Sequence, residues 1–574
     1  MKRLPVFSLL LSFLLINLCC IAQEPPGACI LWTTYEAEQM QTNGIVLQAA
    51  YDPFRVETES SGQGAVKLQA GGQYVAFIAA AKANSVIVRY SLPDSKTGGG
   101  LYSWLGIKVN EKQVARCQLH SRNTWLYGKY PFSNNPADGK PRHFYDELRV
   151  KDLFVEKGDT LQLVWEAQGD GEARYCIIDL IDLEQAPAAT TPPAGALWLT
   201  DKRFTGDSVV TDFTVALRKC IAAAVVTGKT VWIPAGNYII TGDIRLPAHI
   251  TINGAGMWHT TLVGNERLYT AADRRVRLIG TGDSIHLADF SLLGSLDYRN
   301  DTEPNDGITG TFGYHSTIEN IWVEHTKVGM WVENSNGLVV RGCRLRNTIA
   351  DGINFCVGMA YSTMENCTAR GTGDDGFAIW PAVFSKQVFV PGHNLISHCT
   401  AQLPFLANGV AVYGGESNVV KNCSFTDITQ GAAVLVSTTF PTASKTTGVN
   451  NNFTGTTVIE NCVIKNSGGF DHEWGWRGAI EICLDRRSIT GIAIKNVVID
   501  QSLSDAISIV AKNDNGEPGH LQNAHLEAVH VNGYGIAVAG KHALSATDEA
   551  NGSLSIQSSF ITNIKTGPAF KVVK

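Results

Sequence analysis

The feature that most constrains the fold is a short repeat in the C-terminal two-thirds of the chain. A strand pattern that ends in Asn recurs, and a second short apolar strand follows each copy; the copies end at Asn320, Asn366, Asn422, Asn461 and Asn496. Strand-only repeats of about 22–24 residues are typical of a β-solenoid. No amphipathic helix of the length needed for a crossover separates the strands. The pattern predicts an all-β protein with a right-handed parallel β-helix over residues 196–574.

Two ladders of side chains are expected along this β-helix. Cysteines occupy equivalent places in successive repeats and predict a column of small buried thiols that form no disulfides; they are Cys343, Cys367, Cys399, Cys423 and Cys462. The repeat asparagines predict a column of turn residues whose side chains bind backbone or one another. Longer spacings between some cysteines indicate loops inserted at 383–393 and 437–453.

A capping helix is expected just before the first coil. Phe213, Leu217, Ile221 and Ala224 share one helical face, and Gly228 is a natural stop. Such a helix would cover the open apolar end of a solenoid.

The N-terminal third predicts a separate domain. Residues 30–184 read as short alternating strands with Gly, Asp and Lys turns, which favours a jelly-roll-like β-sandwich. Residues 185–195 contain three prolines and no charge, as expected for a linker. The sequence therefore predicts two units that fold independently.

The first 22 residues predict a secretory signal peptide. Met1-Lys-Arg precedes an apolar run from Val6 to Leu18, which is too short to span a membrane, and cleavage is expected after Ala22. A lipid anchor on Cys19 or Cys20 is the alternative, but bulky Leu18 stands where a small residue is usual. A net charge of −6 argues against a nucleic-acid partner. A secreted monomer is expected.

Three carboxylates are predicted to meet in one site. Asp351-Gly and Gly-Asp374-Asp375-Gly place Asp351 and Asp375 one repeat of 24 residues apart. The pair should stack about 4.8 Å apart at the backbone, with Asp374 beside it. Carboxylates this close cannot all ionise freely, which suits glycoside hydrolysis by an acid and a base. Asp374 is expected to be the proton donor, and Asp351 and Asp375 the base. A simple turn role explains one Asp-Gly but not the added Asp374.

These segments resemble the catalytic segments of glycoside hydrolase family 87, the α-1,3-glucanases and mycodextranases. The resemblance covers about 197–574 and implies an inverting hydrolase of neutral α-glucans, α-1,3-glucan or nigeran, that needs no cofactor for catalysis. It assigns the family's essential aspartates to Asp351, Asp374 and Asp375. Polygalacturonases share the Asp plus Asp-Asp arrangement, but their Asn-Thr-Asp is Ile349-Ala-Asp351 here, and Asn408-Gly-Val-Ala stands where their Gly-His-Gly is expected.

Four aromatic residues are candidates for sugar binding. Trp380 and Tyr413 each end a strand at equivalent repeat positions, and Trp474 and Trp476 lie in the loop 471–476. Loop tryptophans can equally pack on the protein surface.

The sandwich resembles carbohydrate-binding modules of families 6 and 35, through Tyr35-Glu-Ala-Glu38 and a closing Ile-Asp-Leu strand. The resemblance implies a structural Ca²⁺ held by Glu36, Glu38 and Asp179. The alternative is that these are ordinary surface carboxylates.

Other functions stay open at this point. A dextranase- or polygalacturonase-like hydrolase would use the same carboxylates, a lyase would need a basic residue or Ca²⁺ for a uronate, and an adhesin would have no use for Asp374-Asp375 beside Asp351.

Overall fold

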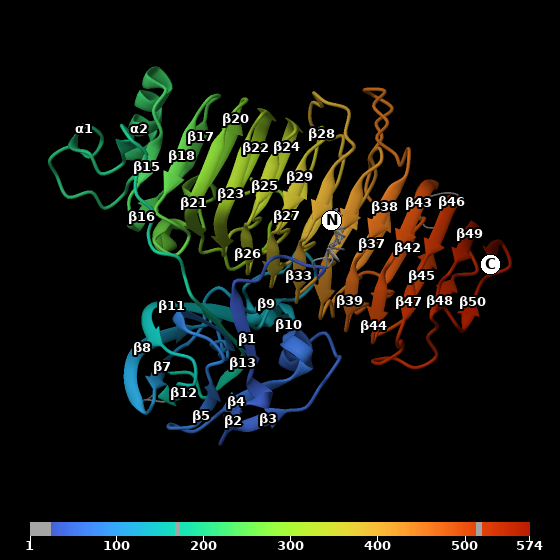
Figure 1. Ribbon diagram of the computed structural model, residues 1–574, viewed down its shortest axis with the longest axis horizontal. Coiled ribbons are helices and arrows are strands. Elements are labelled where there is room, and N and C mark those ends of the chain that lie inside the picture. The colour runs from blue at the N-terminus through green and yellow to red at the C-terminus, as the bar shows by residue number, and fades with distance from the viewer. Residues whose placement is uncertain (1–24, 167–171, 513–518) are drawn as a thin grey trace, which may run out of the picture.

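The computed structural model describes residues 25–166, 172–512 and 519–574, and the chain forms two β domains that pack side by side. Figure 1 shows the β-helix running from α2 at one end to β50 at the other, with the N-terminal sandwich against the middle of its length. The expected signal peptide and its cleavage site lie outside the described residues. No helix within the described ranges is long and apolar enough to cross a membrane.

The sandwich is built from two antiparallel sheets. One has the order β11-β6-β13-β4-β3 with β1 on β13, and the other β2-β5-β12-β7-β8. Alternation explains the packing, since β12 buries Leu161, Leu163 and Trp165 and leaves the residues between them more exposed. The strands are β1 (Trp32–Glu36), β2 (Gln41–Thr42), β3 (Ile45–Leu47), β4 (Ala65–Leu68), β5 (Tyr74–Ile78), β6 (Ala83–Ser91), β7 (Tyr102–Val109), β8 (Lys112–His120), β11 (Asp146–Val155), β12 (Thr160–Glu166) and β13 (Cys176–Glu184). A small ribbon, β9 (Leu126–Tyr127) and β10 (Pro141–Arg142), projects from it.

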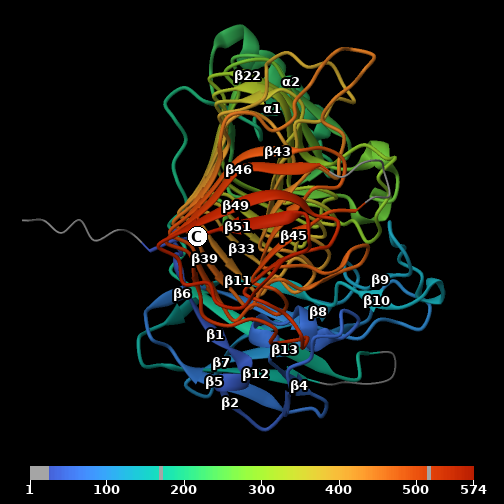
Figure 2. The ribbon, with the colours of Figure 1, turned by 90° about the vertical axis from the view of Figure 1, so that its right-hand side faces the viewer.

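The parallel β-helix predicted from the repeat is confirmed. Among the described residues, a 13-stranded sheet contributes mostly one strand per coil. Its members are β17 (Asp243–Leu246), β20 (Arg277–Thr281), β22 (Gly307–Tyr314), β24 (Met330–Asn336), β27 (Ile353–Phe355), β28 (Met359–Ala360), β31 (Phe377–Ile379), β34 (Val410–Val412), β37 (Val434–Ser437), β42 (Ile480–Cys483), β45 (Ile507–Val510), β48 (Leu544–Ala546) and β50 (Ile564–Lys565). Figure 2, a view from the C-terminal end, shows the coils stacked behind one another above the sandwich.

The other wall is a 23-stranded sheet, counted in the same residues, in which most coils supply two strands. They are β14 (Leu197–Trp198), β15 (Val231–Ile233), β16 (Gly236–Ile240), β18 (Thr251–Gly254), β19 (Thr260–Gly264), β21 (His286–Leu293), β23 (Thr317–Glu324), β25 (Val339–Arg341), β26 (Arg344–Arg346), β29 (Thr363–Glu365), β30 (Thr368–Arg370), β32 (Leu395–Ser397), β33 (Thr400–Gln402), β35 (Val419–Lys421), β36 (Ser424–Thr426), β38 (Thr457–Glu460), β39 (Val463–Lys465), β43 (Ile489–Lys495), β44 (Val498–Asp500), β46 (His520–Glu527), β47 (His530–Val531), β49 (Asn551–Gln557) and β51 (Phe570–Val573).

Both predicted ladders are confirmed. The five repeat asparagines have positive φ, which Asn tolerates better than most residues. Asn461 Nδ2 donates to Asn422 Oδ1 at 3.1 Å, and Asn496 Nδ2 donates to Asn461 Oδ1 at 3.2 Å. The five ladder cysteines are buried free thiols. Each turn therefore supports the next along the axis.

The expected cap is also present. Helix α2 (Thr214–Thr227) buries Leu217, Cys220, Ile221 and Ala224, and it ends at Gly228, whose φ is +68°. A four-residue helix, α1 (Lys202–Thr205), packs beside it. Together they cover the start of the coil stack (Figure 1).

The interface between the two domains is held by buried ion pairs. Arg344 makes a two-pronged contact with Glu184 at 2.7 Å for each bond. Arg370 binds Glu147 at 2.6 Å and Asp182 at 2.8 Å. All five side chains are nearly inaccessible to water. Although the Pro-rich linker predicts independent units, separating them would leave these charges without partners.

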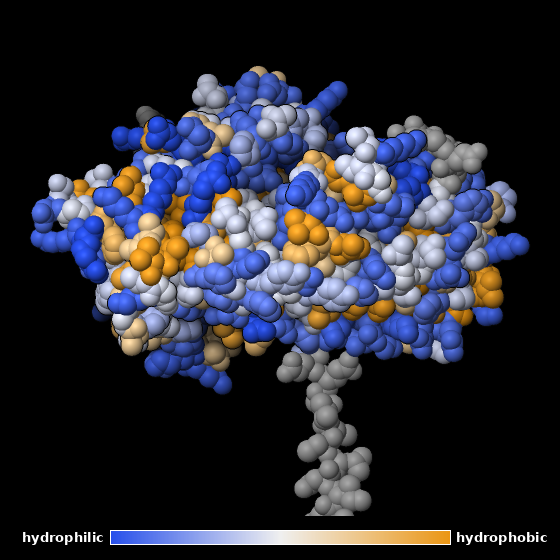
Figure 3. Space-filling view, turned by 90° about the horizontal axis from the view of Figure 1, so that it is seen from above, coloured by the Kyte–Doolittle hydropathy of each residue, from blue (hydrophilic) through white to orange (hydrophobic). Residues whose placement is uncertain are grey.

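The upper face of the molecule carries no single continuous apolar surface. Figure 3 shows apolar side chains there in separate patches between hydrophilic ones. Exposed apolar residues of the molecule include Phe384, Val388 and Val390, which belong to the inserted loop at 383–393. The expectation of a monomer stays a prediction.

Candidate active site

The three aspartates lie together at the entry of two neighbouring strands. Ile353 of β27 pairs with Phe377 of β31 in parallel register, so Asp351 and Asp375 occupy one position in adjacent coils. The amide of Gly352 donates to the carbonyl of Asp375 at 2.9 Å. One oxygen of each carboxylate, including that of Asp374, lies within 4.8 Å of the others. The predicted stack is confirmed.

The next coil adds two residues that serve Asp375. Phe377 pairs with Val410, which places Asn408 directly after Asp375 in the same column. Asn408 Nδ2 donates to Asp375 Oδ1 at 2.8 Å, and the Tyr413 hydroxyl donates to Asp375 Oδ2 at 2.9 Å. The repeat marks Asn408 by its position, but its contact with the carboxylate appears only in three dimensions.

Two of the three carboxyl groups are poised to hold a proton. Burial raises the pKa of Asp351 well above its usual range, and the negative charges of Asp374 and Asp375 raise it further. Burial and then Asp374 raise the pKa of Asp375 to about 7, although Asn408 and Tyr413 oppose this by donating hydrogen bonds. Asn354 donates one hydrogen bond to Asp351, at 3.0 Å.

The third carboxylate has a cationic partner that the sequence pattern missed. Arg299 Nη2 donates to Asp374 Oδ2 at 2.6 Å, and its Nη1 donates to the Gly373 carbonyl at 3.0 Å. This guanidinium lies against the carboxylate that is expected to be the proton donor, and that role for Asp374 stays a prediction. Arg299 comes from a non-repeating segment after β21, so no periodicity placed it.

The three aspartates also differ in their exposure to solvent. The Asp374 side chain is 27% exposed, whereas Asp351 and Asp375 are 6% and 2% exposed. Asp374 is therefore the most accessible of the three to a large ligand.

Two hollows meet at these residues. A cavity of about 780 Å³ is lined by all three aspartates and by aromatic side chains: Tyr130, Trp331, Trp380, Phe384, Tyr413 and Phe440. A second, of about 140 Å³, shares Tyr130, Asp374, Tyr413 and Phe440 with it and extends to the 471–477 loop. The arrangement is a cleft with carboxylates at its middle and apolar ring faces along it, as sugar binding requires.

The predicted aromatic residues fall into different places. Trp380 lines the larger cavity among Trp331, Phe384 and Phe440. Tyr413 is buried and uses its hydroxyl on Asp375, and Trp474 lines the smaller cavity. Trp476 packs edge-on against Phe470 and lines neither of these cavities.

The three residues predicted to bind calcium, Glu36, Glu38 and Asp179, lie in one acidic cluster. Glu36 Oε2 and Glu38 Oε2 are buried with no hydrogen-bond partner among the described residues, and burial raises the pKa of both side chains, that of Glu36 to about 8. Asp179, however, is bound by Arg89 and by the amide of Ser61. The two glutamates suit a cation that prefers oxygen. Burial raises the pKa of Asp179 to about 6 although Arg89 lowers it, and the predicted set of three calcium ligands stays a prediction.

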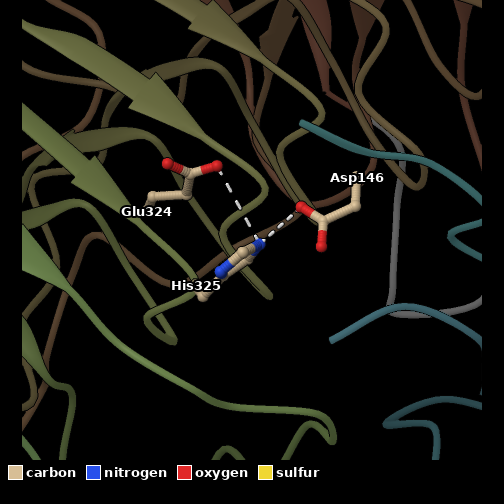
Figure 4. A group of neighbouring side chains, drawn as sticks. All are labelled: Asp146, Glu324 and His325. Atoms are coloured by element: carbon tan, nitrogen blue, oxygen red, sulfur yellow. Dashed lines mark hydrogen bonds and ion pairs between the residues drawn. The ribbon is translucent and has the colours of Figure 1, made fainter. Parts of the chain in front are cut away.

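A second acidic group with a histidine lies at the domain interface. Figure 4 shows His325 pointing its Nε2 toward Asp146 of the sandwich, at 2.7 Å, with Glu324 Oε1 4.0 Å away. Burial lowers the pKa of His325, but Asp146 raises it more, so that it ends above the usual value. The residue types could hold a metal ion. The short His–Asp contact accounts for them as an ion pair that joins the domains.

The fold and the site together define a β-helix hydrolase of glycosidic bonds: stacked carboxylates, a raised pKa on two of them, and an aromatic cleft. Two family models match the chain, alpha-1,3-glucanase catalytic domain D1 over residues 30–186 and alpha-1,3-glucanase catalytic domain D2 over residues 212–571. The protein belongs to this family, the α-1,3-glucanases of glycoside hydrolase family 87. Its sandwich thus matches part of a catalytic unit, and sugar binding by that domain stays a prediction.

Solved structures agree with this placement. The Agl-KA catalytic domain has a TM-score of 0.84 at 26% identity, covering 96% of this chain and 98% of that one. The catalytic unit of a thermostable GH87 alpha-1,3-glucanase from Streptomyces thermodiastaticus strain HF3-3 has a TM-score of 0.80 at 27% identity, covering 96% of each chain. A GH87 alpha-1,3-glucanase catalytic domain in complex with nigerose has a TM-score of 0.75 at 26% identity, covering 96% and 99%. No curated protein sequence matches the chain.

Proposed function

We propose that this glycoside hydrolase cleaves the α-1,3-glucosidic bonds of α-1,3-glucan or nigeran with inversion, using Asp351, Asp374 and Asp375. The observation that carries the proposal is the meeting of two in-register carboxylates and Asp374 beside them at the middle of one aromatic cleft. In structures of a GH87 alpha-1,3-glucanase catalytic domain, single aspartates were changed to alanine, and those aspartates have the sequence spacing of these three. Two of these variants hold tetrasaccharides.

Exposure supports Asp374 as the general acid. The glycosidic oxygen belongs to a large substrate and is reached most easily by the least buried side chain, whereas a water molecule can reach the buried pair. Asp351 and Asp375 are then the base that activates this water.

The resting proton must move before the reaction. In the free protein the raised pKa of Asp351 and of Asp375 favours a proton on this pair. Substrate in the cleft excludes water near Asp374 and favours transfer of that proton to it. Arg299 then stabilises the carboxylate that forms when Asp374 protonates the leaving oxygen.

A neutral sugar fits the charges of the larger cavity better than a uronate. Arg299 is bound to Asp374 and Asp301, Arg277 to Asp243, and Lys327 Nζ to the carbonyls of Asn300 and Glu303. Three of the four cations that line the cavity therefore already have partners, and an acidic sugar gains little from them. The fourth, Arg245, makes no ion pair among the described residues. A polygalacturonase-like activity is therefore the weaker alternative.

The test is a substrate panel followed by product analysis. Purified protein is incubated with α-1,3-glucan, nigeran, dextran and polygalacturonate, and reducing sugar is measured. Release from the first two alone is expected, and release from polygalacturonate alone would refute the proposal. NMR of the earliest products should show the β-anomer, and α-anomer would rule out inversion.

Secretion and a structural calcium ion complete the proposal. The N-terminal Met1-Lys-Arg and the apolar run after it support export, which suits an insoluble polymeric substrate. Glu36, Glu38 and Asp179 would hold the Ca²⁺. Adding Ca²⁺ to chelator-treated protein should raise the thermal midpoint, and a Glu36→Gln variant should lose this response.

A further inference from the structure

The sandwich domain reaches into the cleft through one tyrosine. Tyr130 lies in the segment between β9 and β10, and it lines both cavities that meet at the aspartates. Its hydroxyl accepts a hydrogen bond from Arg299 Nη2 at 3.0 Å and donates one to Asp301 Oδ2. The same Arg299 nitrogen binds Asp374. Two contacts, Tyr130 to Arg299 and Arg299 to Asp374, therefore lead from the N-terminal domain to the proposed proton donor.

The segment that carries Tyr130 is fixed from both sides. Phe132 is buried, together with Leu126, in the hydrophobic core of the β-helix, and its carbonyl accepts from the amide of Arg299 at 3.2 Å. The Tyr130 ring stacks on His472 with centroids 5.5 Å apart. The guanidinium of Arg299 lies 4.8 Å from the centre of the same ring. The hydroxyl is thus held where it can act on Arg299.

Two anions compete for this guanidinium. Arg299 Nε donates to Asp301 Oδ1 at 3.0 Å, while its Nη2 serves Asp374. The Tyr130 hydroxyl occupies the second oxygen of Asp301 and also accepts from Nη2. Without the hydroxyl, Asp301 would have a free oxygen with which to draw Arg299 away from Asp374.

We propose that Tyr130 is a positioning residue for Asp374: its hydroxyl holds Arg299 against that carboxylate, so the sandwich supplies part of the active centre. The inference rests on the proposed role of Asp374. It makes the N-terminal domain a participant in catalysis rather than an attached binding module.

Tyr130→Phe tests this with little structural change, because the ring that stacks on His472 and faces Arg299 remains. The expected kcat is about 10-fold lower, with KM changed less than about 3-fold, since the loss concerns alignment of the acid. The basic limb of the pH profile, which reports the proton donor, should move to higher pH by about half a unit, because less positive charge then faces the carboxylate. Arg299→Met should move it further in the same direction.

Tyr102→Phe is the matched control. Tyr102 lies in the same domain and is 42% exposed, close to the 41% of Tyr130, but it lines neither cavity at the aspartates. Its activity and pH profile should equal those of the unchanged protein. A Tyr130→Phe variant with an unmoved basic limb would overturn the inference while leaving the proposed function intact. Failure of the unchanged protein on α-1,3-glucan and nigeran would instead count against the proposed function.

Thermal stability tests the coupling of Tyr130 to Asp374 whether or not the protein is active on these glucans. Thermal midpoints are measured for Tyr130→Phe, Asp374→Asn and the double variant. Because one Arg299 nitrogen joins the two side chains, the effects should be non-additive. Additive shifts would show that Tyr130 and Asp374 are not coupled and would overturn the inference.

Discussion

The buried pairs of Arg370 give the sharpest test of how the two domains depend on one another. Arg370 at the end of β30 binds Glu147 and Asp182 of the sandwich, and all three side chains are at most 4% exposed. Arg370→Met keeps most of the side-chain volume but leaves two buried carboxylates. Arg346 remains 3.6 Å from Glu147 and compensates only one of them. Loss of one partner from a buried ion pair costs about 3–5 kcal/mol, and we expect Arg370→Met to lower the free energy of unfolding by an amount in this range.

The assay is thermal or urea unfolding of the full chain near pH 7. Arg341→Met is the control, because Arg341 pairs with Glu319 and Glu365 but is 52% exposed, and it should cost at most about 1 kcal/mol. Burial raises the pKa of Glu147, but Arg370 and Arg346 lower it more. A lowered folded pKa means that this stabilisation is present above the usual Glu range and is lost as pH falls through the lowered value. The difference in the free energy of unfolding between Arg370→Met and the unchanged protein should therefore become smaller at acid pH. Equal losses for Arg370→Met and Arg341→Met would refute the reasoning.

Three further predictions concern the cleft and the domain boundary. Replacing Asp351, Asp374 or Asp375 by Asn should lower glucan turnover by several orders of magnitude while the fold is retained. Only Asp374→Asn should keep activity on an α-glucosyl fluoride, because the fluoride leaving group needs no proton. If Asp351→Asn keeps this activity instead, the proposed roles of the two residues must be exchanged. The pKa of Asp375 is about 7, and the hydrogen bond from Tyr413 helps to keep it from rising further. Tyr413→Phe should therefore raise this pKa and move the acid limb of kcat/KM to higher pH. An unmoved limb would show that Asp375 is not the base. A shortened chain that begins at Gly195 should be poorly folded or inactive, even on soluble oligosaccharide. It lacks the carboxylate partners of Arg344 and Arg370, and it lacks Tyr130. Full activity of this chain would show that the domain interface is dispensable.

Local pattern was sufficient for the architecture and for the meeting of the three carboxylates. Each coil repeats the same strand and turn, so one register relates Asp351 to Asp375 as soon as the repeat is recognised. The turn asparagines, the cysteine column and the capping helix follow from the same periodicity, because each depends on residues close in sequence or one repeat away.

Contacts between segments far apart in sequence were decided only by the tertiary structure. Arg299 lies 75 residues before Asp374, and Tyr130 lies 169 residues before Arg299, in another domain. Neither belongs to a repeat, so nothing in the sequence placed them at the cleft. Likewise, only the fold shows that Arg89 pairs with Asp179 of the predicted calcium site, and that Arg344 and Arg370 join the two domains across the linker. A periodic pattern fixes which residues face one another across neighbouring coils, but the charge around a carboxylate depends on every segment that packs against it, and that is set by the assembled fold.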